Sequence, residues 1–457
     1  MDAVGRPRPG TPFARNAYSR MVERPTKAAG GQALDRARRD AAAKTRVDNI
    51  NLRSKTCQME YPRTIAGKLL ELARYFPAIA VSGARQSGKT FLVQKTFPRH
   101  HYVSLDLPSI AEQAERAAPA FLREHPQPVV IDEVQYAPAL FRFLKAEIDR
   151  DRHAMGRFIL TGSQQFVLMK GISDSLAGRC AIVDLENLSR EEISAVQAVT
   201  DKTDTLISLM ARGQFPELWR VPDLPRRDFY ASYLATYLER DVRQILNVTS
   251  LRDFERFIRV LAARSANILN KSDVARDVGI SVKAVGDWLS VLQASGQIIL
   301  LEPWFESFGK RIVKTPKVYF RDTGLLCFLM NLDEKTLGGS PSMGAVWETF
   351  VFSEMRKMAQ QGQREVRFWY YRDQRGREID FVIETGGRLS FLECKWREQL
   401  TADDTQHLLS VREDMATSRS RWDAGKSWVV GVPTASHPIS EHVSAGRLRD
   451  LRSILDQ

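Results

Sequence analysis

Residues 81–97 read "VSGARQSGKTFLVQKTF", and Gly83 opens the pattern G-x-x-x-x-G-K-[ST]. The apolar residues 78–81 before this glycine predict a buried strand, whereas the residues after Lys89 show helical spacing. Glycines between a strand and a helix let the backbone curl, so that its N–H groups and the positive end of the helix converge on one point. The stretch therefore predicts a phosphate-binding loop, with a chance glycine-rich turn as the alternative.

Each residue of this loop has an expected role in holding a nucleotide. We expect Lys89 to reach the β- and γ-phosphates and the Thr90 hydroxyl to ligate Mg²⁺, so the predicted ligands are ATP and Mg²⁺. The predicted nucleotide-binding residues of the loop are Gly83, Ala84, Arg85, Gln86, Ser87, Gly88, Lys89 and Thr90.

Two adjacent carboxylates follow a second apolar run, "PVVIDEVQ", at residues 128–135. Burying carboxylates without a partner is costly, which favours a functional role here. Asp132 is predicted to supply the second protein contact of the Mg²⁺. Glu133 is predicted to be catalytic, because it could orient and deprotonate the attacking water. Its presence favours hydrolysis over nucleotide binding alone.

A third apolar run, "RFILTGSQQ" at residues 157–165, delivers further polar residues. We expect Ser163 or Gln164 to sense the γ-phosphate, with a helix N-cap as the alternative. Arg179 follows in "SDSLAGRC", and a guanidinium aimed at a γ-phosphate raises the rate by about 10³–10⁵-fold. This arginine is predicted to be catalytic, in its own chain or in the neighbouring subunit of a homo-oligomer. A solvent-facing arginine is the alternative.

Nine short motifs follow one another along the chain. They are "GARQSGKT", "VVIDEVQ", "FILTGSQQ", "SLAGR", "YLERDV", "KVYFRDTGLL", "WETFVFSEM", "EIDFVIE" and "LECKW". In this order they resemble the bacterial and archaeal AAA-superfamily ATPases that carry a poorly characterised C-terminal domain. The resemblance covers about residues 59–400 and implies ATPase chemistry. It departs at "ARGQFPEL", residues 211–218, where the family tends to have two glycines before the aromatic residue.

Residues 263–305 predict two helices, joined by a turn at Gly279 and followed by a β wing. Ser272 and Ser281 are expected as the N-caps of the two helices. The residues expected to pack the second helix against the first are Val285, Trp288, Leu289 and Leu292. This arrangement is typical of a winged helix.

A winged helix can bind DNA or pack against protein, and the sequence leaves both open. The second helix offers DNA little beyond Lys283, and Asp287 would repel it. Basic side chains among aromatic residues favour DNA binding further on. They are Lys310, Arg311, Lys314, Lys317 and Arg321.

Charged residues in the C-terminal part resemble the core of restriction-endonuclease-like nucleases. Asp380 lies on one predicted strand, Glu393 and Lys395 on the next, and Glu348 on the preceding helix. The resemblance implies that Asp380 and Glu393, with Glu348, hold Mg²⁺, and that Lys395 is a second-site catalytic residue that polarises water or phosphate. Ile379 stands where a proline often precedes the aspartate. Buried ion pairs or charges on an edge strand are the alternative.

Short β-rich runs alternate with helical stretches over residues 61–187, which is typical of a parallel sheet wrapped by helices. We expect an α/β chain with a P-loop NTPase sheet, a helical lid, a winged helix and a C-terminal restriction-endonuclease-like domain. The expected boundaries are 1–58 for a disordered basic leader, 59–187 for the ATPase core, 188–260 for the lid, 261–336 for the winged helix, 345–435 for the nuclease-like domain and 436–457 for a tail.

The composition excludes several classes of protein. A hydrophobic content of 43% with 27% charged residues is typical of a globular chain, and no apolar run approaches the ~20 residues that span a bilayer. No secretory signal is apparent, so we expect a cytoplasmic protein. The four cysteines form no CxxC pair and the seven histidines show no ligand spacing, so neither a zinc site nor a disulfide framework is expected.

The net charge of +12 is unevenly distributed, since residues 1–60 hold 13 Lys and Arg against 6 Asp and Glu. This leader is expected to be either a disordered extension or a basic arm that touches nucleic acid. A further alternative is that Met59 is the biological start, because "MEYPRTIAGKLLELARYF" opens the first convincing helix.

Two functions compete at this point. One is an Mg²⁺-dependent ATPase that couples its nucleotide state to DNA binding or processing. The other is a nucleotide-dependent regulatory switch that binds a protein partner and whose nuclease-like domain is catalytically inactive.

Overall fold

The computed structural model describes residues 60–163, 165–237, 251–304, 315–362, 364–417 and 422–456. The chain divides into two units, Met1–Gln58 and Met59–Gln457, and all the described residues lie in the second. The expected leader therefore lies outside the described residues, as do Gln164, Lys310, Arg311 and Lys314.

A five-stranded parallel sheet carries the phosphate-binding loop. Its strands, in the order β2-β3-β4-β1-β5, are β2 His101–Ser104, β3 Val129–Asp132, β4 Phe158–Gly162, β1 Ala78–Gly83 and β5 Cys180–Leu185. Every neighbouring pair is parallel. All residues of β1, β3 and β4 are buried, which explains why their apolar runs lack alternation. The prediction of an α/β fold with a parallel P-loop sheet is confirmed.

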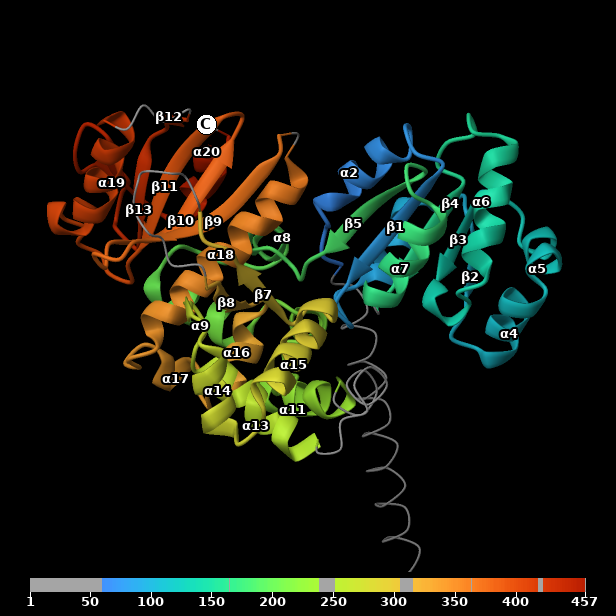
Figure 1. Cartoon of the computed structure of the whole chain (residues 1–457), viewed down its shortest axis with the longest axis horizontal. Helices are drawn as coiled ribbons and strands as arrows, with labels where there is room; N and C mark the ends of the chain where they lie inside the picture. The colour runs from blue at the N-terminus through green and yellow to red at the C-terminus, as the bar shows by residue number, and fades with distance from the viewer. Residues whose placement is uncertain are drawn as a thin grey trace, which may run out of the picture. The chain divides into compact units, whose positions relative to one another are not determined.

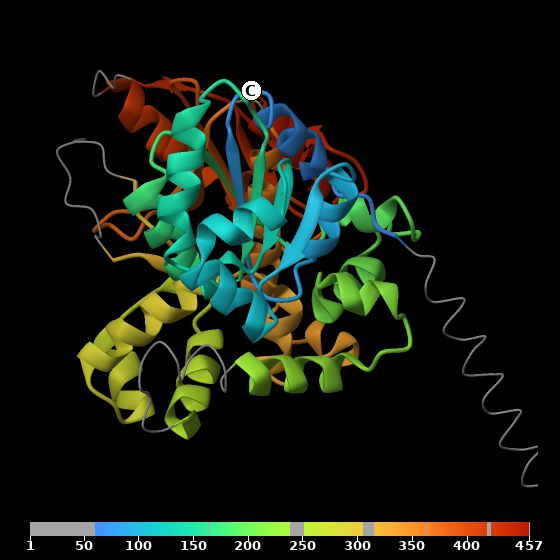
Figure 2. The same ribbon diagram turned by 90° about the vertical axis from the view of Figure 1, so that its right-hand side faces the viewer.

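Two layers of helices cover this sheet (Figures 1 and 2). Ile79 and Val81 pack with the apolar residues of α2 and α3 on one face, whereas Ala78 and Ala80 pack with α4 to α7 on the other. Alternate residues of β1 thus enter different cores, as the period of two in a strand requires. The segments are α2 Ile65–Leu72, α3 Lys89–Thr96, α4 Pro108–Arg116, α5 Ala118–Glu124, η1 Val134–Tyr136, α6 Leu140–Arg150 and α7 Gln165–Ser175.

Helices dominate the next segment. They are α8 Arg190–Ser194, α9 Thr203–Arg212, α10 Pro216–Arg220, α11 Arg226–Tyr237, α13 Leu251–Ala262, α14 Lys271–Val278, α15 Val282–Ala294, α16 Thr323–Leu329 and α17 Glu334–Leu337. An antiparallel sheet of order β6-β8-β7 accompanies them, with β6 Asn267–Ile268, β7 Ile298–Leu301 and β8 Lys317–Phe320.

The turn between α14 and α15 follows the expected pattern, with one correction. Gly279 ends α14 in the left-handed region at φ 83°, and Ser281 caps α15 by accepting the N–H of Ala284 at 3.1 Å. The cap of α14 is Asn270 and not Ser272, because the Asn270 side chain accepts the N–H of Ser272 at 3.0 Å. The prediction missed it because asparagine is an equally good cap, and Asn270 lies only two residues before Ser272. The expected packing face is buried at Val285, Leu289 and Leu292, with Trp288 partly buried.

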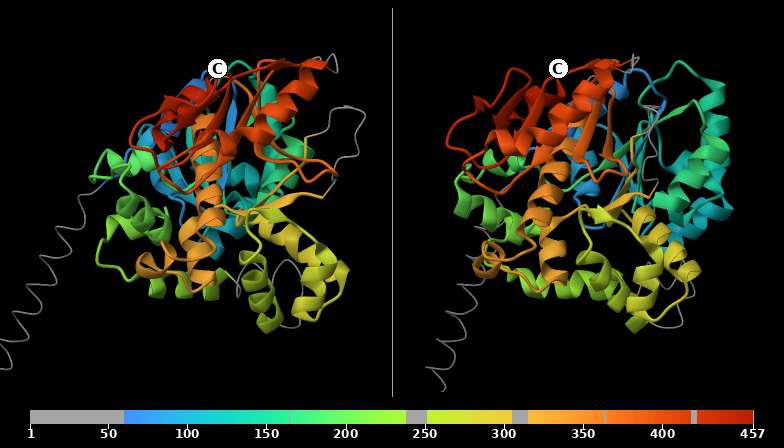
Figure 3. Two further views of the ribbon diagram at one scale, coloured as in Figure 1. Left: turned by 90° about the vertical axis from the view of Figure 1, so that its left-hand side faces the viewer. Right: turned by 60° about the vertical axis from the view of Figure 1, so that its left-hand side comes forward.

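The C-terminal part is a mixed sheet with helices on both faces (Figure 3). The strands, in the order β14-β15-β13-β11-β10-β9 with β12 also pairing β11, are β14 His437–Pro438, β15 Val443–Gly446, β13 Ser427–Val430, β11 Arg388–Cys394, β10 Glu378–Thr385, β9 Val366–Arg372 and β12 Asp423–Ala424. The helical segments are α18 Met343–Gln361, η3 Ala402–Thr405, α19 Gln406–Thr417, η4 Leu448–Asp450 and α20 Leu451–Leu455.

Residues 436–457 differ from the expected tail, because they contribute β14, β15 and α20. Val443 is buried in the α19 face of the sheet, and Leu451 and Ile454 are buried on the α18 face. The strands are too short for their alternation to be recognised in the sequence. In the described ranges, no helix combines the length and apolar character that crossing a bilayer requires.

Trp347 offers a test of the C-terminal core. The side chain of this α18 residue is fully buried, donates its indole N–H to the Val430 carbonyl at 3.2 Å and packs against Trp396. We predict that Trp347→Ala lowers the free energy of unfolding by about 3–5 kcal/mol in urea denaturation, because it leaves a large cavity. Phe143→Ala is the control, since Phe143 is 39% exposed and should cost under about 1 kcal/mol. Equal effects of the two variants would contradict this packing.

Candidate functional site

The predicted phosphate-binding loop joins β1 to α3. Gly83 ends β1 at φ 149°, and a Cβ at this position would lie 2.5 Å from the Leu185 carbonyl oxygen, so only glycine fits. Gly88 caps α3 from the left-handed region at φ 90°. The Lys89 ammonium is buried inside the loop and donates to the carbonyls of Gly83 and Ala84, each at 3.0 Å. Burial lowers the pKa of Lys89.

Side chains near the carboxyl ends of the strands meet beside this loop. Asp132, the last residue of β3, accepts hydrogen bonds from Thr90 and Tyr102, each at 2.7 Å, and from Thr161. A hydroxyl and a carboxylate this close supply the hard oxygen ligands that Mg²⁺ prefers. The loop N–H groups, Lys89, Thr90 and Asp132 could therefore hold a magnesium nucleotide.

Glu133 lies next to this pair, in the left-handed region at φ 56°. Its carboxylate accepts the Ser163 hydroxyl at 3.0 Å and the side-chain amide of Gln135. The structure thus brings Glu133 and Ser163 together, as the sequence predicted. Tyr102 and Gln135 were missed. The run "YVSLDL" predicts a strand, which would have placed Tyr102 in the sheet. Its contact with Asp132 depends on the pairing of β2 with β3, which the sequence does not reveal.

Arg179 is not brought to the loop of its own chain. It precedes β5, and its carbonyl accepts the N–H of Ala78, the first residue of β1, at 3.3 Å. It therefore lies at the opposite end of the sheet, about 20 Å from the loop at the usual strand rise of about 3.3 Å per residue. Its guanidinium pairs with Asp149 at 2.8 Å. A role in a neighbouring subunit stays a prediction.

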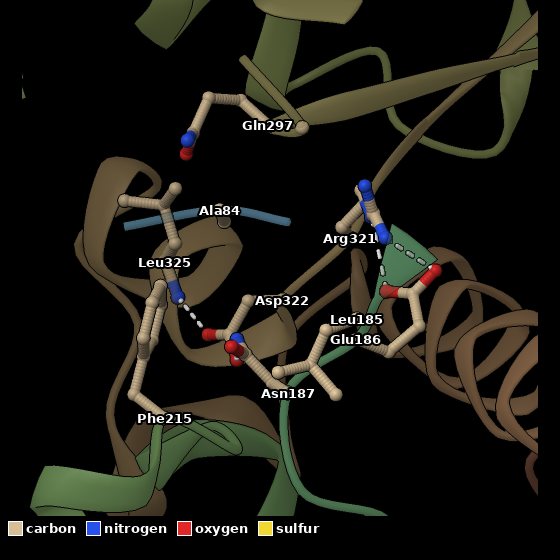
Figure 4. Close-up of a pocket in the computed structure, with 10 residues that line it drawn as sticks. Ala84, Leu185, Glu186, Asn187, Phe215, Gln297, Arg321, Asp322 and Leu325 are labelled. Atoms are coloured by element: carbon tan, nitrogen blue, oxygen red, sulfur yellow. Dashed lines mark hydrogen bonds and ion pairs between the residues drawn. The ribbon is translucent and has the colours of Figure 1, made fainter. Parts of the chain in front are cut away.

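A buried ion-pair network adjoins the loop at the end of β5 (Figure 4). Glu186 accepts from Arg321 at 2.9 Å and from Arg356 of α18 at 2.6 Å, and Arg321 also pairs with Asp184 at 2.9 Å. Burial would raise the pKa of Glu186, but the two guanidinium groups lower it to about 2. Residues from three distant parts of the sequence are therefore joined by charge.

Asp322 is the second centre of this junction (Figure 4). Its carboxylate accepts from the Asn187 amide at 3.0 Å, the Gln214 N–H at 2.9 Å and the Tyr230 hydroxyl at 2.8 Å, and it caps α16 through the Leu325 N–H. The motifs "ARGQFPEL" and "KVYFRDTGLL" thus meet at one buried carboxylate, beside a small cavity that Ala84 of the loop also lines.

Glu354 of α18 extends the junction into the C-terminal part. It is fully buried and accepts from the Gln214 side chain at 2.6 Å, the Arg190 N–H at 3.0 Å and the Lys357 ammonium at 2.9 Å. Lys357 also donates to the Leu188 carbonyl at 3.0 Å. Several motifs of the family resemblance therefore meet in one buried polar joint.

The ligands of the predicted C-terminal metal site lie close to lysine ammonium groups. Within the described part of the chain, no three Asp, Glu, His or Cys residues are arranged to hold a metal ion. Glu348 and Asp380 surround the ammonium of Lys317, and Glu393 pairs with Lys395 at 2.8 Å. The Lys317 ammonium therefore lies against two of the three carboxylates that were expected to share Mg²⁺, whereas Oε2 of the third, Glu393, is buried without a hydrogen-bond partner.

Two of the basic side chains that were expected to favour DNA binding, Lys317 and Arg321, are buried. Lys317 is 1% exposed and Arg321 is 8% exposed, both within ion pairs. On α15, Lys283 pairs with Asp287 at 3.0 Å. The ion pairs of Lys317 and Arg321 could not be predicted, because their carboxylate partners are far away in sequence.

Removing the Glu186 charge should show what the junction contributes. We predict that Glu186→Gln lowers the free energy of unfolding by about 3–5 kcal/mol at pH 7, because two guanidinium groups lose their buried partner. Glu71→Gln is the control, since Glu71 pairs with Lys68 at the surface.

The effect should depend on pH. The folded pKa of Glu186, about 2, lies below its ordinary value of 4.5, so its stabilisation is complete above about pH 4.5 and is lost as the pH falls toward 2. In urea denaturation the difference between wild type and Glu186→Gln should narrow between pH 5 and pH 3.5. A difference that widens over this range would show that the network does not hold a charged Glu186.

Three family models match the chain. The model described as "AAA domain" matches residues 75–194, and two models described as "Domain of unknown function (DUF8612)" and "Domain of unknown function (DUF4143)" match residues 203–336 and 343–443. Two uncharacterized proteins, of Mycobacterium bovis and Mycobacterium tuberculosis, are each 28% identical over 348 residues, covering 74% of this chain and 75% of the relative.

Similarity to solved structures is more distant. The Walker-type ATPase PABY2304 of Pyrococcus abyssi is 14% identical with a TM-score of 0.41, covering 59% of this chain and 96% of that chain. The RuvB Holliday junction branch migration motor of Thermotoga maritima is 16% identical with a TM-score of 0.28, covering 52% and 89%. Likenesses this distant assign no substrate or partner. The family match, the loop and the parallel sheet identify residues 75–194 as an AAA-type ATPase domain.

Proposed function

We propose that this chain is an Mg²⁺-dependent ATP hydrolase that works as a regulatory switch, in which the nucleotide state of the loop reaches the C-terminal part through the buried junction. One observation carries this proposal. Arg63 donates to the Ser87 carbonyl in the loop at 2.8 Å and to the Glu186 carbonyl in the junction at 2.6 Å. A single buried guanidinium thus ties the backbone of the loop to the backbone of the junction.

Each residue beside the loop has a role in the proposed hydrolysis. Mg²⁺, held by Thr90 and Asp132, would neutralise charge on the phosphate oxygens. The loop N–H groups and Lys89 bind and orient the β- and γ-phosphates. The Glu133 carboxylate takes the proton of the attacking water, and the Ser163 hydroxyl holds that carboxylate in place.

A second contact between loop and junction supports the coupling. Gly296, in the turn between α15 and β7, has φ +69°, and a Cβ there would lie 2.9 Å from the Arg321 guanidinium and 3.6 Å from the Ala84 nitrogen. The absence of a side chain lets the loop, this turn and Arg321 approach one another. A shift of the loop backbone would therefore displace the Arg321 guanidinium, which Glu186 holds together with that of Arg356.

DNA binding is the second candidate. The order of α14, Gly279 and α15 supports it, because this is the order of a helix-turn-helix. The charges of α14 and α15 favour a protein partner instead, since Lys283 pairs with Asp287 and Arg276 pairs with Asp273. Anisotropy of a labelled DNA duplex, with and without ATP, separates the two candidates: binding that ATP changes by tenfold or more supports DNA.

Two variants separate nucleotide binding from hydrolysis. We predict that Lys89→Ala weakens binding of a fluorescent ATP analogue by at least about 100-fold, because a buried cation no longer meets the phosphates. Glu133→Gln should retain the affinity but slow phosphate release by about 10²–10⁴-fold, because the amide cannot accept the proton. Lys95→Ala, at an exposed position of the same helix, is the matched control. Turnover unchanged in Glu133→Gln would remove this residue from the mechanism.

Hydrogen exchange tests the coupling itself. ATP bound to Glu133→Gln should change the protection of residues 317–329 and 343–361 as well as that of the loop, and Lys89→Ala should abolish both changes. Changes confined to residues 83–90 and their strand neighbours would leave an ATPase without the proposed switch.

A further inference from the structure

Lys317 places an ammonium group in the middle of three carboxylates. Its Nζ lies 3.1 Å from Glu348 of α18, and 2.6 Å and 3.4 Å from Glu378 and Asp380 of β10. The side chain is 1% exposed and comes from β8, which belongs to the three-stranded sheet and not to the sheet of β10. Three carboxylates from two elements, α18 and β10, therefore converge on the Nζ atom of Lys317.

The remaining hydrogen bonds of these carboxylates come from the protein. Tyr319 donates its hydroxyl to Glu348 at 2.5 Å, and the Cys394 N–H donates to the second oxygen of Asp380 at 2.9 Å. Glu378 also pairs with Arg372 at 2.8 Å. The ammonium has three N–H donors and meets three carboxylates, which matches its hydrogen-bonding capacity.

We propose that Lys317 is the resident cation of this cluster, and that the cluster therefore takes no divalent metal ion. A Mg²⁺ ion needs oxygen ligands at about 2.0–2.1 Å. One oxygen of each carboxylate already lies within 3.4 Å of Nζ. A divalent ion and an ammonium in one buried site would also repel each other strongly, because the dielectric constant there is low. Metal-dependent cleavage of phosphodiesters at this cluster is then excluded.

The backbone of Lys317 is fixed by its place in the sheet. It begins β8, which is the central strand of its sheet between β6 and β7. The residue that follows the other end of this strand is Arg321, which Glu186 and Asp184 hold at the junction. Moving this backbone would require β8 to break its pairing with β6 and β7 and to disturb the ion pairs of Arg321. The cation is thus built into the fold.

The test is isothermal titration of the full chain with Mn²⁺ in the absence of nucleotide. Wild type and Asp380→Asn should show the same weak binding, because the cluster binds no Mn²⁺ in either. Lys317→Met, which keeps the length of the side chain but removes the charge, should gain a site that binds at least tenfold more tightly. That gain should disappear in Lys317→Met/Asp380→Asn. Lys335→Met, at an exposed position of α17, should behave as wild type.

Two results would overturn the proposal. One is a stoichiometric Mn²⁺ site in wild type that Asp380→Asn removes. The other is a Lys317→Met variant with a native circular dichroism spectrum that binds Mn²⁺ no better than wild type. If Lys317→Met fails to fold, the comparison of wild type with Asp380→Asn decides alone. The test uses no nucleotide, so its outcome is independent of ATP hydrolysis.

Discussion

A buried carboxylate must find a cation, and Glu186 shows how much structure this constraint determines. It follows the last strand of the ATPase sheet, at 6% exposure, and its cations come from Arg321 after β8 and Arg356 on α18. Leaving any of these three charges unpaired would cost several kcal/mol. The end of β5, the end of β8 and α18 are therefore required to meet beside the loop, where Arg63 and Gly296 touch its backbone.

The same reasoning explains the C-terminal acids. Four carboxylates, those of Glu348, Glu378, Asp380 and Glu393, lie close together, and each has a cation of the protein within 3.4 Å. In the sequence these residues resemble a magnesium site because carboxylates on neighbouring strands and a nearby lysine are the residues such a site needs. In the structure Lys317 supplies the positive charge from outside the domain. Two sites thus share β8, with Lys317 at one end and Arg321 just beyond the other.

Local signals were sufficient for the ATPase sheet and its loop. The loop pattern, the apolar runs and the carboxylates after β3 all lie within short stretches of sequence, and the structure places Thr90, Asp132, Glu133 and Ser163 together. Long-range partners were not predictable in this way. Tyr102 approaches Asp132 only because β2 pairs with β3, and Lys317 and Arg321 looked solvent-exposed because their carboxylates lie at least 31 and 135 residues away. Arg179 does not reach the loop of its own chain for another reason: it precedes its strand, and the loop lies after the strands.

The tryptophans make the central claim of coupling directly measurable. All eight lie at or after residue 219, so none is in the ATPase domain, and Trp219→Phe removes the one that lies on α10 beside the loop. Urea unfolding of that variant, followed by tryptophan fluorescence, should shift to higher urea when ATP is present at 100 times its Kd. If the C-terminal part unfolds together with the ATPase domain, bound ATP should raise its free energy of unfolding by about 2.7 kcal/mol. An unchanged midpoint, with ATP shown to be bound, would contradict the account.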